Sequence, residues 1–427
     1  MLKTNTIYDV AVIGGGPAGL MAAGRAAESG AKVILLEKNT QTGRKLLLTG
    51  GGRCNFTNNE PDTRRFLAKF KEHQKFLFSP FSRFGVKETI EFFNSHGMPT
   101  KVEAENRVFP VSDLSQSVLD VMMDYIQSGQ VELKTGVTAD GFLSKDKKII
   151  GLKIKKSDSD QKAKQEIIKA RSYILATGGK SRPDTGSTGE GFDWLRELGH
   201  TILNADAALV PLKVSDAWVK SLAGLSLQDV KLKVWQNNKK QTEAIGKMLF
   251  THFGVSGPLV LNMSRQIGAF LKNGSVSMTL DLKPEQDEKE LDEELLELLQ
   301  GHQNKNIQNS LNGLLPSALA PVLIELANIN PQKEINSLTR SERLTLIRLI
   351  KDLPFTVESL MGLDKAVVTS GGIDLQEVEL KTMRSRLYPN LFVVGDVLNI
   401  DRPSGGYSLQ LCWTTGYVAG TEAAKKN

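Results

Sequence analysis

Hydrophobic positions near the N-terminus form a buried strand, a helix of small residues and a second buried strand. The apolar runs cover residues 8–13 and 33–36, and the small-residue segment covers residues 20–29. Uninterrupted apolar runs of this length are typical of parallel strands that are covered on both faces. The pattern therefore predicts a βαβ unit at the start of the chain.

Changes of hydrophobic period divide the rest of the chain. Short β-type runs dominate residues 207–282, which predicts a β-rich domain. Residues 284–353 follow a helical period instead, with one helix predicted to start after Thr339. Strand-like runs at 366–369 and 391–394 then indicate that the chain returns to its N-terminal fold.

Composition is that of a globular protein with more than one domain. The 427 residues are 40% hydrophobic and 24% charged, and a chain of this length exceeds a single core. The N-terminal apolar run is too short for a secretory signal, and the strongest later run, 314–327, contains two prolines and a glutamate. We therefore expect a cytoplasmic protein without a membrane span. Cys54 and Cys412 lie far apart and indicate neither a disulfide scaffold nor a metal site.

The net charge of +6 is local. Residues 145–171 contain ten Lys and Arg against four Asp and Glu, so this segment accounts for the whole surplus. Apolar runs at 149–154 and 167–170 read as strands that flank a polar loop, which favours a solvated basic hairpin. A phosphate-binding surface is the alternative. We therefore expect no nucleic-acid partner.

The junction between the first strand and the helix carries the G-x-G-x-x-G pattern of dinucleotide-binding proteins. Glu37 ends the second strand, eighteen residues after Gly19. Glycine lets the backbone turn sharply and approach a diphosphate, the helix N-terminus offers unpaired N–H groups, and the carboxylate accepts a ribose hydroxyl. The predicted contact residues are Gly14, Gly15, Gly16, Pro17, Ala18, Gly19, Glu37 and Lys38.

Three later segments narrow the dinucleotide to a flavin. Two strands end in glycine-containing turns, and a pair of glycines precedes a helix at 409–424; the residues concerned are Thr177, Gly178, Gly395, Asp396, Gly405 and Gly406. The chain here resembles the two-dinucleotide-binding-fold flavoproteins, in which an acidic residue after a late strand holds the FAD ribitol. In that fold a C-terminal helix also points its positive end at the flavin. We predict noncovalent FAD, because no flavin-linking histidine context is present.

The segments 43–45, 50–55, 251–258 and 395–407 resemble the BaiN-like family of bacterial NAD(P)/FAD-dependent oxidoreductases. The resemblance spans nearly the whole chain. It implies an α/β fold with a Rossmann-like FAD-binding domain built on a parallel sheet, an inserted β-rich, barrel-like domain and a helical insertion. Some members are linked to reduction of steroid-like bile acid intermediates, but the family does not fix a substrate. The FAD contacts that it implies are Gly14, Gly16, Glu37, Arg44, Arg53, Asn55, Gly395 and Asp396.

Domain boundaries follow from the changes of period and from the resemblance. The FAD-binding domain is expected to be discontinuous, at residues 1–200 and 360–427. The β-rich substrate or cap domain is expected at 201–283 and 353–370, and the helical insertion at 284–352.

Individual side chains are candidates for catalysis and for the diphosphate. His252, in a glycine-bounded turn of the β-rich domain, is either a proton relay beside hydride transfer or a structural histidine that hydrogen-bonds its own loop. Cys54 is either a thiol redox partner or a packed small residue. Arg44, Lys45 and Arg53 are candidate diphosphate ligands, because a basic cluster beside the glycine turn has an anion to meet; the alternative is a solvated loop.

The leading hypothesis is an FAD-dependent oxidoreductase acting on a small molecule. No second G-x-G-x-x-G lies in a βαβ pattern, so NADH or NADPH would bind only transiently as the electron donor. Two alternatives stay open: a flavin-dependent RNA-modifying enzyme, and a flavin-binding protein with a sensing or structural role. Salt-sensitive RNA binding favours the first alternative, and a flavin that no donor or acceptor can cycle favours the second.

Overall fold

The computed structural model describes residues 6–155, 166–300, 306–307, 311–366 and 368–425. The chain divides into two compact units, each of which is described by itself. The first unit contains Met1–Ala207 and Ala366–Asn427, and the second contains Ala208–Lys365. The predicted fold class is confirmed: a sheet of mainly parallel strands, a closed barrel and several helices are all present.

A seven-stranded sheet forms the centre of the first unit, in the order β6-β2-β1-β9-β8-β7, with β18 beside β9. The predicted N-terminal strands pair in parallel, with Val10 opposite Val33 and Ile13 opposite Leu36. The antiparallel strands β7, β8 and the start of β9 form the predicted basic hairpin region, whose connecting loop at 156–165 lies outside the described residues. The strands are β1 (Ile7–Ile13), β2 (Val33–Glu37), β6 (Glu132–Thr135), β7 (Ala139–Lys145), β8 (Lys148–Ile154), β9 (Glu166–Leu175) and β18 (Leu391–Val393).

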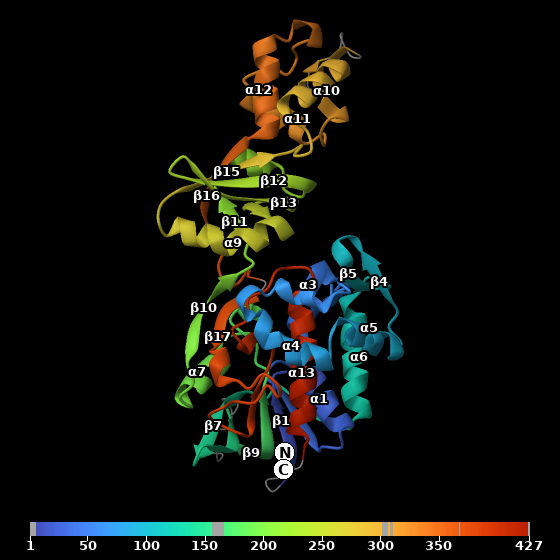
Figure 1. The fold of residues 1–427 in the computed structure, drawn as a ribbon, viewed down its shortest axis with the longest axis vertical. Helices are drawn as coiled ribbons and strands as arrows, with labels where there is room; N and C mark the ends of the chain where they lie inside the picture. Colours follow the sequence, from blue (N-terminus) through green and yellow to red (C-terminus); the bar gives the residue numbers. More distant parts are fainter. Residues whose placement is uncertain (1–5, 156–165, 301–305, 308–310, 367, 426–427) are drawn as a thin grey trace. The chain divides into compact units, whose positions relative to one another are not determined.

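Two helices from opposite ends of the sequence pack side by side against this sheet, α1 (Pro17–Glu28) and α13 (Tyr407–Ala423) (Figure 1). The contact is close because α13 presents glycines to the backbone of α1. A Cβ atom on Gly416 would lie 2.4 Å from the carbonyl oxygen of Ala18, and one on Gly420 would lie 2.5 Å from that of Ala22. Only glycine permits this approach.

The remaining elements of the first unit complete its layers. A three-stranded sheet in the order β3-β5-β4 and a two-stranded sheet, β10-β17, lie outside the main sheet. Several helices lie between residues 59 and 128, where no hydrophobic period described above predicts an element. The helices are α2 (Arg44–Leu47), α3 (Thr63–Ala68), α4 (Gln74–Arg83), α5 (Val86–Ser95), α6 (Ser115–Ser128) and α7 (Glu190–Glu197), and the strands are β3 (Thr57–Asn58), β4 (Thr100–Glu103), β5 (Arg107–Pro110), β10 (Ile202–Ala208) and β17 (Val368–Ile373).

The second unit is built on a closed antiparallel barrel in the order β11-β14-β13-β12-β15-β16. Alternating residues of β12 point inward, so Val230, Leu232 and Val234 are buried as their pattern predicts. The barrel strands are β11 (Leu212–Val214), β12 (Ser226–Gln236), β13 (Lys239–Thr251), β14 (Gly254–Ser256), β15 (Val276–Asp281) and β16 (Leu353–Leu360), and the helices α8 (Ala217–Ser221) and α9 (Pro258–Leu271) accompany them.

Three further helices, α10 (Glu288–Gln300), α11 (Leu319–Leu326) and α12 (Arg340–Lys351), stand between β15 and β16 in the sequence. They share one hydrophobic cluster with the barrel strands, including the regularly spaced Leu291 and Leu295 of α10. Thr339 caps α12 as predicted, because its side chain accepts from the backbone N–H of Glu342, whose carboxylate returns the contact. No described helix of either unit is long and apolar enough to cross a membrane.

Candidate functional site

A pocket of the first unit lies where its parallel strands end. Residues 14–16, 37–38, 176–178 and 394–396 line it, and they follow or end β1, β2, β9 and β18, respectively. Ligands of open α/β sheets bind at this edge, outside the carboxyl ends of the strands. The pocket contains about 1140 Å³ of empty space, its open mouth included.

The glycine turn after β1 has the geometry that a diphosphate needs. Gly14 has φ +106°, and a Cβ there would lie 2.5 Å from the carbonyl oxygen of Ala176. A Cβ on Gly19 would lie 1.9 Å from the carbonyl oxygen of Gly14, so this glycine allows α1 to pack closely on the turn. Gly16 caps α1, and a Cβ there would meet no described atom within 4 Å. The helix N-terminus is therefore open to an anion.

Glu37, at the end of β2, connects the glycine turn to the next loop. Its Oε2 accepts a hydrogen bond from the backbone N–H of Gly15 at 2.8 Å. Its Oε1 accepts from the backbone N–H and the side-chain amide of Asn39, both at 2.7 Å. The side chain is nearly buried, but it lines the pocket. Since each carboxylate oxygen can accept two hydrogen bonds, Oε2 retains capacity for a ribose hydroxyl.

Asp396, in the turn η9 (Gly395–Val397) after β18, is another acidic residue of the pocket lining. Its carboxylate pairs with the buried guanidinium of Arg402 and lies 3.4 Å from the ammonium of Lys45. Burial alone would raise the pKa of Asp396, but the positive charges of Arg402 and Lys45 bring it below its ordinary value. Asp396 is therefore ionised at neutral pH and held in place.

Arg402 connects Asp396 to the start of α13. Its Nε donates to the Ser408 hydroxyl at 3.0 Å, and its Nη1 donates to the carbonyl oxygen of Ile400 at 2.7 Å. Both Asp396 and Ser408 line the pocket, whereas Arg402 is not among the lining residues. Arg402 is thus a positioning residue behind the pocket wall.

The N-terminus of α13 is fixed by the predicted glycine pair. Gly406 has φ +96°, and a Cβ there would lie 2.3 Å from the carbonyl oxygen of Thr57. The side-chain oxygen of Asn55, in its hydrogen-bonded orientation, accepts from the backbone N–H of Gly406 at 3.1 Å. The side-chain amide of Asn58 donates to the carbonyl oxygen of Gly405 at 3.2 Å. These contacts orient the helix start.

The residues present fit a bound dinucleotide. The Thr177 hydroxyl is buried at the pocket lining and has no hydrogen-bond partner among the described residues. An unpaired buried hydroxyl is costly unless a ligand satisfies it. Together with the open helix end at Gly16 and the oriented carboxylates of Glu37 and Asp396, it indicates where a polar ligand would lie.

The structure brings most of the predicted cofactor residues into this one pocket. Those in the lining are Gly14, Gly15, Gly16, Pro17, Ala18, Glu37, Lys38, Arg44, Lys45, Thr177, Gly178, Gly395 and Asp396. Gly19, Asn55, Gly405 and Gly406 support the turns around it but are not lining residues. Their predicted contacts with FAD stay predictions.

Arg53, a predicted diphosphate ligand, lies outside the pocket lining. Its guanidinium pairs with the carboxylates of Glu103, at 2.5 Å, and Asp113, and it lies 4.3 Å from the centre of the Phe109 ring. Lys101 joins the same carboxylates, so Arg53 belongs to a surface ion-pair network.

The two catalytic candidates have different surroundings. His252 lies on the exposed turn between β13 and β14 of the second unit, with its ring against that of Phe253 at 4.9 Å. Its role as a proton relay stays a prediction. Cys54 is fully buried in the first unit and does not line the pocket, and burial raises the pKa of its thiol to about 12. A thiolate is therefore not available there at neutral pH.

Several lining residues carry no local sequence signal. They come from loops and from helices that the motifs do not reach, and they include Asn39, Val137, Thr185, Ser187, Trp194, Ser408 and Cys412. Ser181, which accepts from the Lys45 ammonium at 2.5 Å, carries no local signal either. Arg402 does not line the pocket, but its charge and its place shortly after Gly395-Asp396 are a sequence signal, because a buried arginine needs a partner.

Comparisons with known proteins agree with this geometry. A family model described as "HI0933-like protein Rossmann domain" matches residues 8–422. A 3-dehydro-bile acid delta(4,6)-reductase of Clostridium scindens is 33% identical over 420 residues, which cover 98% of this chain and 99% of that protein. A ribosomal RNA dihydrouridine synthase of Escherichia coli K12 is 28% identical, with 98% and 99% covered.

A solved structure resembles the chain over its full length. It is the 3-ketosteroid-delta4-(5alpha)-dehydrogenase of Rhodococcus jostii RHA1 in complex with 4-androstene-3,17-dione, with a TM-score of 0.56 and 16% sequence identity. The alignment covers 100% of this chain and 98% of that chain. At this level of identity the likeness concerns the fold.

Proposed function

Because the chain belongs to the HI0933-like Rossmann family of flavoproteins and is a flavin-dependent oxidoreductase, we propose that it reduces a carbon–carbon double bond conjugated to a carbonyl group. The observation that carries the proposal is the single pocket that joins the glycine turn, Glu37, Asp396 and the start of α13. These elements are the ones that hold a dinucleotide in the Rossmann fold, which supports FAD as the cofactor of this pocket.

The choice of reaction rests on what two full-length relatives have in common. One is named as a reductase of a 3-dehydro bile acid at positions 4 and 6, where double bonds are conjugated to the 3-oxo group. The other is named as a dihydrouridine synthase, and dihydrouridine is uridine whose ring double bond beside a carbonyl is reduced. Both reactions add a hydride and a proton to an activated double bond. We favour a small-molecule substrate, because the more similar relative acts on one.

The residues of the pocket would hold noncovalent FAD. The open N-terminus of α1 at Gly16 binds the diphosphate, and Glu37 accepts from the adenosine ribose. Asp396, held ionised by Arg402 and Lys45, accepts from the ribitol, and the start of α13 favours negative charge on the ring. When bound, FAD supplies hydride transfer.

The proposed electron donor is NADH or NADPH. Only one nucleotide fingerprint is present in the sequence, at Gly14 to Gly19, so a nicotinamide would bind transiently rather than in a second Rossmann domain. We place the protein in the cytoplasm, where both nicotinamides are regenerated.

The test begins with the purified protein. Acid or heat should release FAD from the wild type, whereas Gly16→Val should be purified without flavin, since a side chain there occupies the diphosphate position. Stopped-flow bleaching of the flavin with NADH and with NADPH identifies the donor. The reduced protein is then mixed with a 4-en-3-one steroid, with a simple cyclic enone and with a uridine-containing RNA transcript.

Each outcome has a distinct meaning. Reoxidation by an enone, with the saturated ketone as product, supports the proposal. Reoxidation only by RNA, with dihydrouridine formed, would replace the small-molecule substrate by RNA. A flavin that no donor reduces and no acceptor reoxidises would leave a sensing or structural role. Recovery of FMN, or of no flavin in the wild type, contradicts the cofactor.

A further inference from the structure

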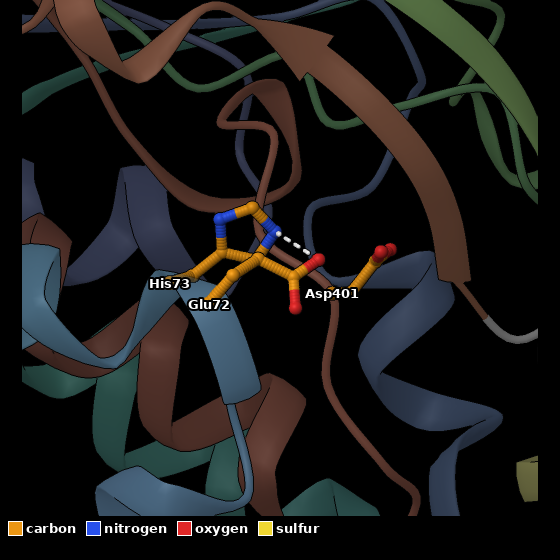
Figure 2. A group of neighbouring side chains, drawn as sticks. All are labelled: Glu72, His73 and Asp401. Atoms are coloured by element: carbon orange, nitrogen blue, oxygen red, sulfur yellow. Dashed lines mark ion pairs between the residues drawn. The ribbon is translucent and has the colours of Figure 1, made fainter.

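A cluster of three side chains that could bind a metal lies in the first unit, and none of the three is among the residues that line the pocket. Glu72, His73 and Asp401 each place one ligand atom within 4.8 Å of the other two. Figure 2 shows Glu72 and His73 leaving the same short turn, with Asp401 beside them. The His73 Nε2 and Glu72 Oε1 atoms are 3.7 Å apart. No reaction proposed above uses these side chains.

The backbone holds the first two ligands on a tight turn. They belong to the short helical turn η2 (Lys71–His73), which begins with Lys71 at φ +52° and continues directly into α4. The backbone N–H of His73 donates to the carbonyl oxygen of Phe70 at 3.0 Å. The Phe70 ring packs on the Tyr407 ring at 6.0 Å, which fixes η2 against the start of α13.

The third ligand comes from a distant part of the sequence. Asp401 lies between η9 and α13, and its Oδ1 accepts a hydrogen bond from the Ser370 hydroxyl at 2.8 Å. Metal-binding carboxylates are commonly oriented by a hydrogen bond of this kind. Asp401 and His73 are half-buried, whereas Glu72 is exposed.

We infer that Glu72, His73 and Asp401 form a site for one divalent ion of the zinc type. An imidazole nitrogen and two carboxylate oxygens are ligands that zinc accepts, and three protein ligands leave a fourth position for water. Zinc bonds of about 2.0–2.2 Å place tetrahedral ligand atoms roughly 3.4 Å apart. The Glu72–His73 pair is already near this spacing at 3.7 Å. No pair of ligand atoms is more than 4.8 Å apart, so no separation needs to shorten by more than about 1.4 Å.

Magnesium is the less suitable ion. It takes oxygen ligands almost exclusively and demands near-octahedral geometry, whereas this cluster offers a nitrogen donor. A bound zinc ion would join η2 to the loop before α13. The site does not depend on the flavin chemistry, so its failure and the failure of the proposed function can be told apart.

The experiment uses full-length protein with its flavin. After treatment with EDTA and removal of the chelator, the protein is titrated with zinc against a chromophoric competitor, and bound metal is counted by mass spectrometry after gel filtration. We expect one zinc per chain, an increase in melting temperature on zinc addition, and no competition from an excess of magnesium.

Variants assign the site. Asp401→Asn and His73→Gln should each weaken zinc binding by more than tenfold, and Ser370→Ala, which removes only the orienting hydrogen bond, should weaken it by about 10–100-fold. The matched control is His96→Gln, because His96 is exposed and its Nδ1 contacts only local partners at Ser95 and Phe92. This variant should bind zinc as the wild type does.

Two results would overturn the inference. One is a wild type that retains no zinc; the other is equal affinity in the wild type, Asp401→Asn and His73→Gln, which would place the metal elsewhere. Circular dichroism and flavin content identify a variant that fails to fold. The near-isosteric Asp401→Asn then decides the question, since an amide keeps the shape of the loop but is a poor zinc ligand.

Discussion

Replacing Glu37 by alanine tests the central polar contact of the pocket. The carboxylate accepts from the backbone N–H of Gly15 at 2.8 Å and from two N–H groups of Asn39 at 2.7 Å. The substitution removes the proposed ribose ligand. It also leaves the N–H of Gly15, in the middle of the glycine turn, without its acceptor.

The magnitude follows from these bonds. A hydrogen bond to a charged group contributes about 1.5–3 kcal/mol, and a buried donor left unsatisfied costs about 1–3 kcal/mol. We therefore expect Glu37→Ala to weaken FAD binding by about 1–3 kcal/mol, which is roughly a 5- to 150-fold increase in Kd. The flavin-free protein should lose about 1–3 kcal/mol of unfolding free energy as well, because the N–H of Gly15 in the folded variant lacks its acceptor whether or not FAD is bound.

The assay is a titration of the flavin-free protein with FAD, in which quenching of flavin fluorescence measures binding. Glu190→Ala is the matched control, because Glu190 also lines the pocket but pairs with Lys38 at 2.9 Å on a side chain that is 40% exposed. Its Kd should stay within about threefold of the wild type, since exposed pairs contribute little. An unchanged Kd in Glu37→Ala, or an equal increase in Glu190→Ala, would refute the assignment of Glu37 to the ribose.

Three further predictions concern the ion pair, the proton relay and the thiols. Arg402→Met should destabilise the flavin-free protein by about 3–5 kcal/mol at pH 7, because it leaves Asp396 buried without its main counter-charge. The pKa of Asp396 is lowered by its partners. The ion pair therefore stabilises the fold at pH values above the unfolded-state pKa, and this stability is lost as the pH falls through the lower folded-state pKa. The urea midpoints of the wild type and Arg402→Met should converge toward acid pH, and a difference between them that does not change with pH contradicts the pairing. His252→Gln should slow reoxidation by substrate by roughly a hundredfold and spare reduction by a nicotinamide, whereas equal losses in both half-reactions would indicate a damaged loop. Burial raises the pKa of Cys54 and of Cys412 to about 12, so a thiol reagent at pH 8 should react slowly with both. Cys54, which does not line the pocket, should be labelled only after denaturation, and rapid labelling of Cys54 in the native protein would contradict its burial.

Local motifs predict the parts of the fold in which the interacting residues lie close together in the sequence. The βαβ unit, the glycine turn and the cap at Thr339 are such cases, because strand, turn and helix signals follow directly in the sequence. Asp396 is a similar case, since its place after a late strand is readable from the sequence alone. Each of these lies where its pattern predicts.

The rest of the pocket depends on contacts between distant segments, and no local pattern encodes them. Thr185 and Trp194 line the pocket from the short helical turn η4 (Pro183–Thr185) and from α7, which are far from the glycine turn in the sequence. Arg53 has the same charge as Lys45 and a similar glycine-rich context. It nevertheless forms ion pairs with Glu103 and Asp113 and does not line the pocket. Which anion a basic residue meets is decided by tertiary packing.

The split of the first unit between the two ends of the chain has a consequence for synthesis in the cell. Residues 208–365 form one uninterrupted unit, and a ribosome produces all of them before it reaches β18, Asp396 or α13. Domains generally fold as units while the chain is made. The second unit can therefore be complete while β1 and α1 still lack their C-terminal neighbours. Until the last helix is made, the nascent chain lacks the segment that packs on α1, and the part of the pocket lining that contains Asp396 is completed only when translation is nearly finished.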